Sequence, residues 1–381
     1  MVLNTELLVQ DDYLRDKLEE LKIIYSRMRD KKSKQMYQAF LNLIATKDFT
    51  YLAQIHKLNG IKTDKMYLRF IEYNKMHSCG KKIIFYGIGE RTLNQVRLED
   101  EFKNHVGYCF FPFLSMIPIT AFCDRDYKKY PKGFRDRPVI SPQKLKREYA
   151  DAVIIISTVM YYEEIRAELL EAGIKPENIY LQEYVEYELY EKMQYFEDYM
   201  KSESEGFFVD GGCCNGQTSK LFSQWQSCYK GILAFEPDKK NFNECRRMLK
   251  TLNNGILYPY GLGNKEGKCG FVATGSGASY IDVNAENYIN IKTLDSIVQK
   301  GGYPVTFIKL DVEGAELDAL KGAKKCIQKN LPKLAISAYH KKYDLIELPI
   351  YVMSLSDKYR FNLGIYSNGW FEIVLYAFQN R

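Results

Sequence analysis

Three acidic residues, each placed directly after a short apolar run, are the part of this sequence whose types and spacing can support chemistry. They are Asp210, Glu236 and Asp311. Apolar runs bounded by glycine or proline are typical of buried strands. In a parallel sheet the carboxyl ends of such strands border one crevice, so we expect a ligand pocket at these acids.

The turn after Asp210 has the spacing Asp-x-Gly-x-x-x-Gly, with Gly212 and Gly216 as its glycines. An acid stands where the dinucleotide-binding fingerprint needs its first glycine, and a carboxylate there would repel a pyrophosphate. It suits a ligand with cationic or hydroxyl groups, and S-adenosylmethionine (SAM) carries an ammonium, a sulfonium and a ribose. The alternative is a purely structural turn, because strand-to-helix turns commonly use glycine.

Glu236 favours SAM over the structural alternative. It lies about 20 residues beyond the glycine turn, where a βαβ unit places the acid that bonds ribose hydroxyls. Two acids at the ends of adjacent strands fit an adenosyl group, so SAM is the predicted cofactor.

Asp311 and His340 are the predicted catalytic residues. Methyl transfer from SAM requires the enzyme to align the nucleophile and to remove its proton. Asp311 can act as a base, orient a hydroxyl, or bind Mg²⁺ through oxygen. We favour the first two roles and expect no metal, because the sequence shows no second cluster of oxygen ligands. His340 follows the strand expected at 332–337, and an imidazole pKa of about 6.5 suits proton transfer, with a structural or exposed histidine as the alternative.

Glu313, Tyr339 and Tyr366 are predicted to contact the acceptor. Glu313 follows Asp311 and has the spacing to share a helix face with Glu316. The two tyrosines belong to a group of aromatic residues whose rings can pack against sugars or other carbon-rich rings. The alternative is that these tyrosines belong to the core.

Residues 1–79 are predicted to form a helical region, because Leu14, Leu18 and Leu21 recur at helical spacing. An amphipathic face needs a partner, so this region is either a packing appendage or the contact surface of a homo-oligomer. His56 and His77 are expected at the surface.

Residues 80–184 alternate strands and helices and predict a smaller Rossmann-like domain. Its first strand ends in Gly87-Ile-Gly89, but Thr92 stands where the fingerprint has its third glycine. A structural or substrate-orienting role is therefore favoured over a bound nucleotide or nucleotide-sugar. Residues 185–205 have helical spacing and predict a linker helix.

Residues 206–381 predict an α/β class I methyltransferase sheet, which is doubly wound and mostly parallel. The last two apolar runs, 358–363 and 371–378, flank Asn368-Gly369 and predict a terminal antiparallel hairpin. The strands before them are expected to end at Asp210, Glu236, Gly261, Asp311 and Ser337.

Composition narrows the function classes. The chain has 381 residues, a net charge of +6 and nine cysteines. Basic residues are mixed with nearly as many acids, and Asp311 lacks the Pro-Pro-aromatic sequence of enzymes that methylate flipped bases, so no nucleic-acid partner is expected. The cysteines form no Cys-x-x-Cys pair and no signal peptide is recognisable, which predicts a cytoplasmic protein. No stretch reaches the ~20 apolar residues of a membrane span.

Five segments, taken in order, resemble the FkbM family of SAM-dependent methyltransferases. The resemblance implies O-methylation of hydroxyls on sugars, glycans or secondary metabolites. It also implies that Asp210, Gly212, Gly216 and Glu236 hold SAM, and that Gly261 and Asp311 occupy motif positions. The five segments are Phe-Val-Asp-Gly-Gly-Cys-Cys-Asn-Gly at 208–216, Ala-Phe-Glu-Pro-Asp at 234–238, Gly-Leu-Gly-Asn-Lys-Glu-Gly at 261–267, Ile-Lys-Leu-Asp-Val-Glu-Gly-Ala-Glu at 308–316 and Val-Leu-Tyr-Ala at 374–377.

Residues 80–183 resemble the Rossmann-like domain of bacterial polysaccharide-modifying proteins, through Phe-Cys-Asp-Arg-Asp at 122–126 and Pro-Val-Ile-Ser-Pro at 138–142. This resemblance implies surface or flagellar glycan chemistry. One stretch departs from the FkbM pattern, because Gly364-Ile365 replaces a common Arg-His before Tyr366 and Ile373 replaces a threonine. The departure implies a different acceptor or a weakened activity.

The combined prediction is a SAM-dependent O-methyltransferase in polysaccharide biosynthesis, with a saccharide or nucleotide-sugar acceptor. N-methylation of an amino sugar or amino-acid substituent is the alternative, since an amine needs less help from a base. A non-catalytic nucleotide-sugar-binding protein is the rival from another class. The presence of both Asp210 and Glu236 argues against that rival.

Overall fold

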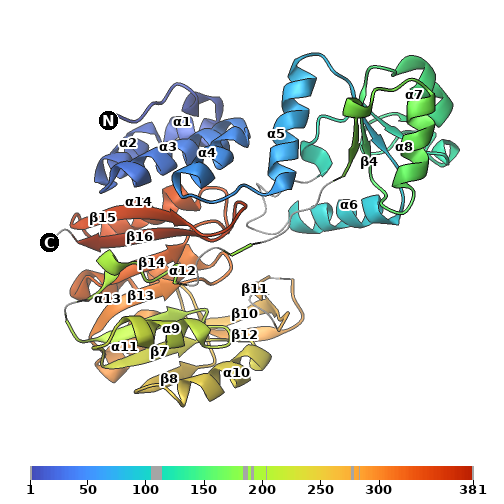
Figure 1. Cartoon of the computed structure of the whole chain (residues 1–381). Coiled ribbons are helices and arrows are strands. Elements are labelled where there is room, and N and C mark those ends of the chain that lie inside the picture. The colour runs from blue at the N-terminus through green and yellow to red at the C-terminus, as the bar shows by residue number, and fades with distance from the viewer. Residues whose placement is uncertain are drawn as a thin grey trace. The chain divides into compact units, whose positions relative to one another are not determined.

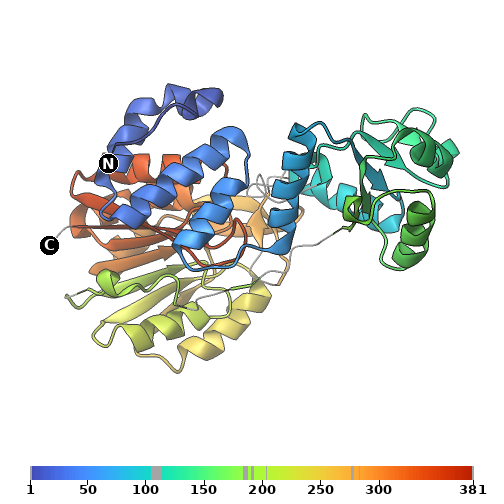
Figure 2. The same cartoon turned by 45° about the horizontal axis from the view of Figure 1, so that its top comes forward.

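The protein divides into two compact units, shown in a computed structural model (Figures 1 and 2). The structure describes residues 2–103, 114–182, 188–189, 193–202, 204–275, 279–282 and 284–379. Unit 1 comprises Met1–Lys47, Gln54–Ile61 and Glu188–Arg381, and unit 2 comprises Asp48–Ala53 and Lys62–Tyr187. In chain order, unit 2 therefore interrupts unit 1.

A seven-stranded sheet organises unit 1, in the order β15-β16-β14-β13-β6-β7-β8. The five strands from β14 to β8 are parallel, and the last two strands of the chain form an antiparallel hairpin at one edge. This arrangement confirms the predicted fold class. The strands are β6 (Phe207–Gly211), β7 (Gly231–Phe235), β8 (Gly255–Tyr258), β13 (Val305–Leu310), β14 (Lys333–Ser337), β15 (Tyr359–Ile365) and β16 (Ile373–Gln379).

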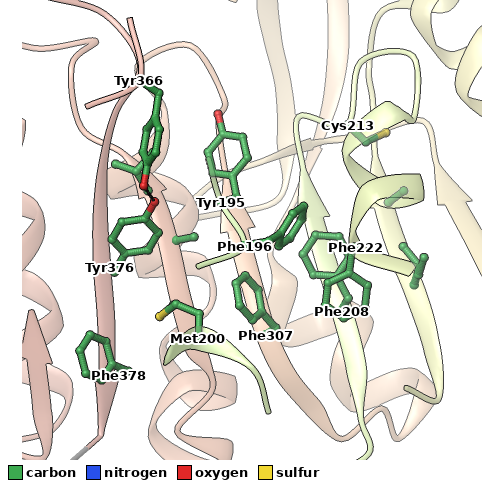
Figure 3. Packing of buried hydrophobic residues seen from close by; sticks show 14 of the residues in the cluster. Tyr195, Phe196, Met200, Phe208, Cys213, Phe222, Phe307, Tyr366, Tyr376 and Phe378 are labelled. Atoms are coloured by element: carbon green, nitrogen blue, oxygen red, sulfur yellow. Dashed lines mark hydrogen bonds between the residues drawn. The ribbon is translucent and has the colours of Figure 1, made fainter. Parts of the chain in front are cut away.

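Apolar strand residues pack against helices on each face of this sheet. On one face, Phe208 of β6 stacks on Phe222 of α9 with ring centroids 4.1 Å apart, and Phe196 and Phe307 complete the aromatic group (Figure 3). None of the helices in the described ranges is both long and apolar enough to cross a membrane. The helices that accompany the strands are α9 (Gln217–Trp225), α10 (Lys239–Leu249), α11 (Leu294–Gly301), α12 (Glu316–Gly322), α13 (Lys324–Asn330) and α14 (Asp344–Leu355).

A second, smaller sheet lies between β8 and α11 in the chain and was not expected from the sequence. It has the order β11-β10-β12-β9. The prediction of a strand ending at Gly261 is wrong, because β8 ends at Tyr258 and Gly261 begins β9. Pro259 follows β8 and has no N–H to continue the ladder. The strands are β9 (Gly261–Leu262), β10 (Gly267–Val272), β11 (Tyr280–Ile281) and β12 (Tyr288–Lys292).

The amino-terminal helices of unit 1 pack along the edge strand β15 (Figures 1 and 2). The N–H of Arg29 donates to the carbonyl of Phe361 at 2.9 Å, and the N–H of Leu363 donates to Oγ of Ser33 at 3.0 Å. These bonds satisfy an edge that would otherwise offer free backbone groups. The elements are η1 (Leu8–Gln10), α1 (Asp12–Asp16), α2 (Leu18–Arg27), α3 (Lys31–Thr46) and α4 (Thr50–Leu58), whose first residues belong to unit 2.

His56 corrects the expectation that both amino-terminal histidines lie at the surface. It is fully buried in unit 1, and its Nε2 lies 3.1 Å from the carbonyl oxygen of Gly369. Burial lowers its pKa to about 4. His77 is exposed, as predicted. The helical period at 50–58 leaves open which side faces the core, so only packing determines the position of His56.

Unit 2 contains a five-stranded parallel sheet in the Rossmann-like order β3-β2-β1-β4-β5. The turn after β1 is closed by Asp124, whose Oδ2 accepts the N–H of Ile88 at 2.7 Å. The acid that would face a ribose in a dinucleotide site therefore bonds the turn itself. The elements are α5 (Lys65–Ser78), β1 (Ile83–Tyr86), α6 (Glu90–Lys103), η2 (Leu114–Met116), β2 (Ala121–Cys123), η3 (Tyr127–Lys129), β3 (Val139–Ile140), α7 (Pro142–Glu148), β4 (Val153–Ile156), α8 (Tyr162–Glu171), η4 (Pro176–Asn178) and β5 (Ile179–Leu181).

The predicted linker helix at 185–205 is wrong where the structure can test it. Residues 185–187, 190–192 and 203 lie outside the described residues, while 193–202 form a turn and the short 3-10 helix η5 (Asp198–Met200). The adjacent Tyr195 and Phe196 are both buried against the sheet. This tertiary packing overrides the helical preference of the segment.

The aromatic group of unit 1 gives the first testable prediction. Phe222→Ala removes a ring that stacks on Phe208, and we expect the free energy of unfolding to fall by about 3–5 kcal/mol. Thermal unfolding of the full chain by calorimetry measures the change. Tyr288→Ala is the control, because this tyrosine is 65% exposed and its loss should change stability by less than about 0.5 kcal/mol. Equal melting of Phe222→Ala and the wild type would contradict this packing.

Candidate active site

A cavity lies at the carboxyl ends of β6, β7 and β13, where the strand order reverses. One side is formed by Gly212, Cys214 and Glu236, and another by Asp311 and Glu313. The rest of the wall is largely apolar and comes mainly from the small sheet and the residues that lead into it. These residues are Tyr260, Gly261, Leu262, Phe271, Tyr280, Ile281 and Ile289.

Glu236 is held in place by backbone groups at the cavity. Its Oε2 accepts the N–H of Cys214 at 2.9 Å, and its Oε1 accepts the N–H of Asp238 at 2.8 Å. Burial raises its pKa to about 7, although the two backbone bonds oppose this rise. Each carboxylate oxygen has a second lone pair, so Glu236 can still accept hydrogen bonds from a ligand.

Gly212 brings the turn after β6 close to the end of β13. Its φ is +73°, and a Cβ there would lie 1.8 Å from the carbonyl oxygen of Asp311. Only glycine combines this backbone conformation with this approach. Gly261, on the apolar side, also lines the cavity, and a Cβ there would lie 2.7 Å from Cδ1 of Ile291.

Asp210 is placed behind the turn and does not line the cavity. It is fully buried, with Oδ1 3.3 Å from the Nζ of Lys309 and Oδ2 accepting from Oγ of Ser219 at 2.7 Å. Lys309 also donates to the carbonyls of Gly211 at 3.2 Å and Gly212 at 2.7 Å. Burial lowers the pKa of Lys309, but Asp210 and Asp311 outweigh it and the net shift is upward. Asp210 therefore acts on the glycine turn through Lys309.

Gly216 also lies away from the cavity lining. It precedes α9 with a φ of +84°, and a Cβ there would come within 3.1 Å of Cys245 and Met248. Its role in the structure is to allow close packing of α9 on α10. The structure thus brings Gly212, Glu236 and Gly261 together at the cavity and places Asp210 and Gly216 behind it.

His340 does not line the cavity; it is buried among acids, next to Asp311 and Glu313, which do line it. Its Nδ1 is 2.9 Å from Oε1 of Glu316, and its Nε2 is 3.4 Å from Oε2 of Glu313 and 3.7 Å from Oδ1 of Asp311. Burial lowers the pKa of His340, but the three carboxylates outweigh it and raise the pKa to about 10. Burial raises the pKa of Glu313. We call Asp311, Glu313 and His340 the carboxylate–histidine cluster.

Tyr195 orients Asp311 from the segment before β6. Its hydroxyl donates to Oδ2 of Asp311 at 3.0 Å and lies 3.3 Å from Oγ of Ser337. Figure 3 shows this hydroxyl pointing away from the phenylalanine rings. Burial raises the pKa of Asp311, but Lys309 and His340 outweigh it, so the net shift is downward and the carboxylate stays ionised.

The two tyrosines predicted to contact the acceptor lie in different surroundings. The ring of Tyr339 is 4.2 Å from the ring of His340, beside the cluster. Tyr366 lies in the core, where its hydroxyl donates to Oε1 of Glu197 at 2.7 Å and contacts the Tyr376 hydroxyl (Figure 3). Tyr366 does not line the cavity.

The ordered motifs of this half of the chain match a known family. Residues 210–361 match the family model described as the methyltransferase FkbM domain. This stretch is an FkbM methyltransferase domain. The protein is therefore a methyltransferase, and SAM is its methyl donor, as the sequence predicted. The apolar wall and the Glu236 carboxylate fit the adenine and the ribose of this donor.

Solved structures also resemble the chain. The methyltransferase FkbM from Methylobacillus flagellatus KT has 17% identity and a TM-score of 0.45, over 91% of this chain and 99% of that chain. A candidate methyltransferase from Streptococcus mutans in complex with SAH has 15% identity and a TM-score of 0.30, over 46% and 90%. Both TM-scores are below 0.5, so the FkbM assignment rests on residues 210–361. No curated protein matches the chain.

Unit 2 has a separate family match. Residues 79–180 match the family model described as C2185-like, N-terminal. The predicted resemblance of this region to polysaccharide-modifying proteins stays a prediction.

Several residues at the site were not singled out from the sequence. Lys309 could have been identified from the sequence, because a lone charged residue inside the apolar run 305–310 needs a buried partner of opposite charge. Tyr195 had no comparable signal, since it reaches Asp311 from a segment far away in the sequence. Asp344, whose pKa burial raises to about 7, likewise joins the surroundings of His340 only through the fold.

The Asp210–Lys309 pair gives the second prediction. Lys309→Met leaves a buried carboxylate without its cation and should lower the free energy of unfolding by about 3–5 kcal/mol. Adding Asp210→Asn should restore most of this loss, because the amide carries no charge. Thermal unfolding of both single variants and the double variant measures the coupling. Lys292→Met, which breaks the exposed pair with Glu266, should cost only about 0–1 kcal/mol, and an equal loss at both lysines would refute the role of the buried pair.

Proposed function

We propose that the FkbM domain transfers the methyl group of SAM to a hydroxyl of a sugar, glycan or glycoconjugate precursor in the cytoplasm. The observation that carries this proposal is the placement of two different polar groups at one cavity. Glu236 lines the cavity together with the glycine turn and the apolar wall, and Asp311 and Glu313 line it too, with His340 buried behind them. A donor and a hydroxyl acceptor need such different surroundings.

The donor side would hold SAM through contacts of three kinds. Glu236 would accept hydrogen bonds from the ribose hydroxyls, as acids at this position of a βαβ unit do. Gly212 and Gly261 would let the backbone approach the ligand, and the apolar wall would cover the adenine. Asp210 and Gly216 would contribute by fixing the turn and α9. When bound, SAM supplies a methyl carbon activated by its sulfonium.

The acceptor side would orient and deprotonate the hydroxyl. Asp311 presents an oxygen that makes no hydrogen bond, and His340 is held at Nδ1 by Glu316. Asp311 would align the hydroxyl, and a carboxylate of the cluster would take up its proton as the oxygen forms its bond to the methyl carbon. His340, which its acidic neighbours keep protonated, would hold these carboxylates in place. Glu313 and Tyr339 would contact the rest of the acceptor, whereas Tyr366 would support the core behind it.

We propose oxygen rather than nitrogen as the methylated atom because the carboxylate–histidine cluster can act as a base. An amine acceptor needs little help in losing a proton, and a carboxylate–histidine cluster serves a hydroxyl better. The saccharide class rests on the resemblances stated for residues 80–183 and for the FkbM segments. We also propose the domain bounds 80–184 and 206–381 for the two α/β regions.

The third prediction tests the reaction. SAM labelled in its methyl group should transfer label to at least one member of a panel of sugars, glycans and nucleotide-sugars. His340→Gln should lower the rate by about 10²–10⁴-fold while leaving SAM affinity within a few fold, because its role is on the acceptor side. His77→Gln, at an exposed histidine of unit 2, is the matched control. Binding of SAM without transfer to any hydroxyl in the panel, but with transfer to amino sugars, would overturn O-methylation.

The fourth prediction concerns pH. Glu236 has a pKa of about 7, and only the ionised carboxylate accepts bonds from both ribose hydroxyls. SAM affinity should therefore rise by up to about tenfold between pH 6 and 8. The amino group of SAM titrates nearby, with a pKa of about 8, so Glu236→Gln serves as the control. Calorimetry at each pH should show a flatter profile for this variant, and identical profiles would contradict the role of Glu236.

A further inference from the structure

We propose that Asp311, Glu313 and His340 form a binding site for a divalent metal ion. The candidate ligand atoms are one imidazole nitrogen and two carboxylate oxygens, and all three lie within 4.8 Å of one another. Such distances allow one ion to contact all three after small side-chain movements. From the sequence we expected no metal, because no second cluster of oxygen ligands was evident; the fold brings His340 beside Asp311 and Glu313.

Unsatisfied polar atoms are the independent observation that points to a ligand. His340 is only 4% exposed, and its Nε2 makes no hydrogen bond. Oδ1 of Asp311 also makes none. Buried polar atoms are normally hydrogen-bonded, and each exception needs an explanation. Here the two exceptions lie only 3.7 Å apart, one in the turn after β13 and the other in the residues after β14.

Glu316 and Tyr195 orient the carboxylate–histidine cluster, in the way that hydrogen-bond partners orient the ligands of a metal ion. Metal-ligating histidines usually donate their other ring N–H to a carboxylate. Nδ1 of His340 meets Oε1 of Glu316, which also accepts the N–H of Val312 at 2.9 Å. This contact directs Nε2 to the cluster, where a metal ion would replace the Nε2 proton. The Tyr195 hydroxyl holds Oδ2 of Asp311 and leaves Oδ1 for the ion.

The charges at the site also favour a cation. Asp311, Glu313, Glu316 and Asp344 place four carboxyl groups around one imidazole. Lys309, which lowers the pKa of Asp311, already pairs with Asp210. Like charges at short range cost free energy unless an opposite charge compensates them. A protonated His340 supplies one positive charge, and a divalent ion that replaces its Nε2 proton would supply two.

The ligand set indicates the class of metal. Two carboxylates suit Mg²⁺ and Mn²⁺, and an imidazole shifts the preference toward Mn²⁺ or another first-row ion. Three protein ligands leave open positions of the kind that a reaction site needs. We therefore expect Mn²⁺ to bind more tightly than Mg²⁺.

The role of the ion, but not its binding, rests on the proposed function. The acceptor hydroxyl would occupy an open position, where the ion lowers the pKa of the hydroxyl. The C–O bond then forms as the S–C bond breaks, and the bonding pair stays on sulfur, which becomes a neutral thioether. The hydroxyl proton passes to the second oxygen of Glu313. Asp311 and His340 would thus act on the hydroxyl through the ion.

The fifth prediction tests metal binding directly. Mn²⁺ is titrated into chelator-treated full-length protein and followed by electron paramagnetic resonance, a readout that needs no acceptor. We expect one ion per chain, displaced by excess Mg²⁺. Glu313→Gln should weaken Mn²⁺ binding by at least about tenfold. Loss of a direct ligand should lower metal affinity at least as much as loss of a residue that hydrogen-bonds to a ligand. Glu171→Gln, at an exposed acid of unit 2, is the matched control and should bind as the wild type does.

SAM affinity, measured in parallel, separates this proposal from the proposed function. A Glu313→Gln variant that binds SAM normally is folded, so its loss of Mn²⁺ would support the site. Wild-type protein that binds SAM but no Mn²⁺ would overturn the metal site and leave methyl transfer standing. Unchanged Mn²⁺ affinity in Glu313→Gln would place the ion elsewhere and also overturn the site. Protein that binds Mn²⁺ at this site but transfers no methyl group would support the site and overturn the proposed function instead.

Discussion

The buried ion pair between Asp210 and Lys309 is the constraint on which the rest of the site depends. It joins two neighbouring strands at the edge where the sheet reverses its order, and Lys309 also bonds the carbonyls of the glycine turn. An unpaired charge in this position would be costly, so the two residues stay together. The spacing between Gly212 and Asp311, and with it the shape of the cavity, follows from this contact.

The cavity combines two kinds of surface that come from two different sheets. The seven-stranded sheet contributes polar groups, because its parallel strands β7 and β13 are each followed directly by an acid, Glu236 and Asp311. The small sheet contributes most of the apolar wall, through side chains such as Phe271 and Ile289. A ligand with a flat apolar part and several polar groups can be held only where these two surfaces meet.

Much of this arrangement could be predicted from the sequence, because it depends on local pattern. Apolar runs closed by glycine placed β6 and β7 correctly, and Asp311 and His340 were found at the ends of their strands. The inward direction of Asp210 could not be predicted, because its partner lies on a strand formed much later in the chain. The two-residue strands β9 and β11 are too short to show a period. The burial of His56 and of Tyr195 likewise depends on distant partners.

The interruption of unit 1 by unit 2 has a consequence for how the chain is made. Helices α1 to α3 are synthesised before unit 2, whereas the strand that α2 and α3 cover, β15, is synthesised after it. Domains generally fold as units during synthesis, so unit 2 can complete its sheet while those helices still lack their partner. Throughout that interval the apolar faces of these helices lack the sheet edge that they cover in the folded protein.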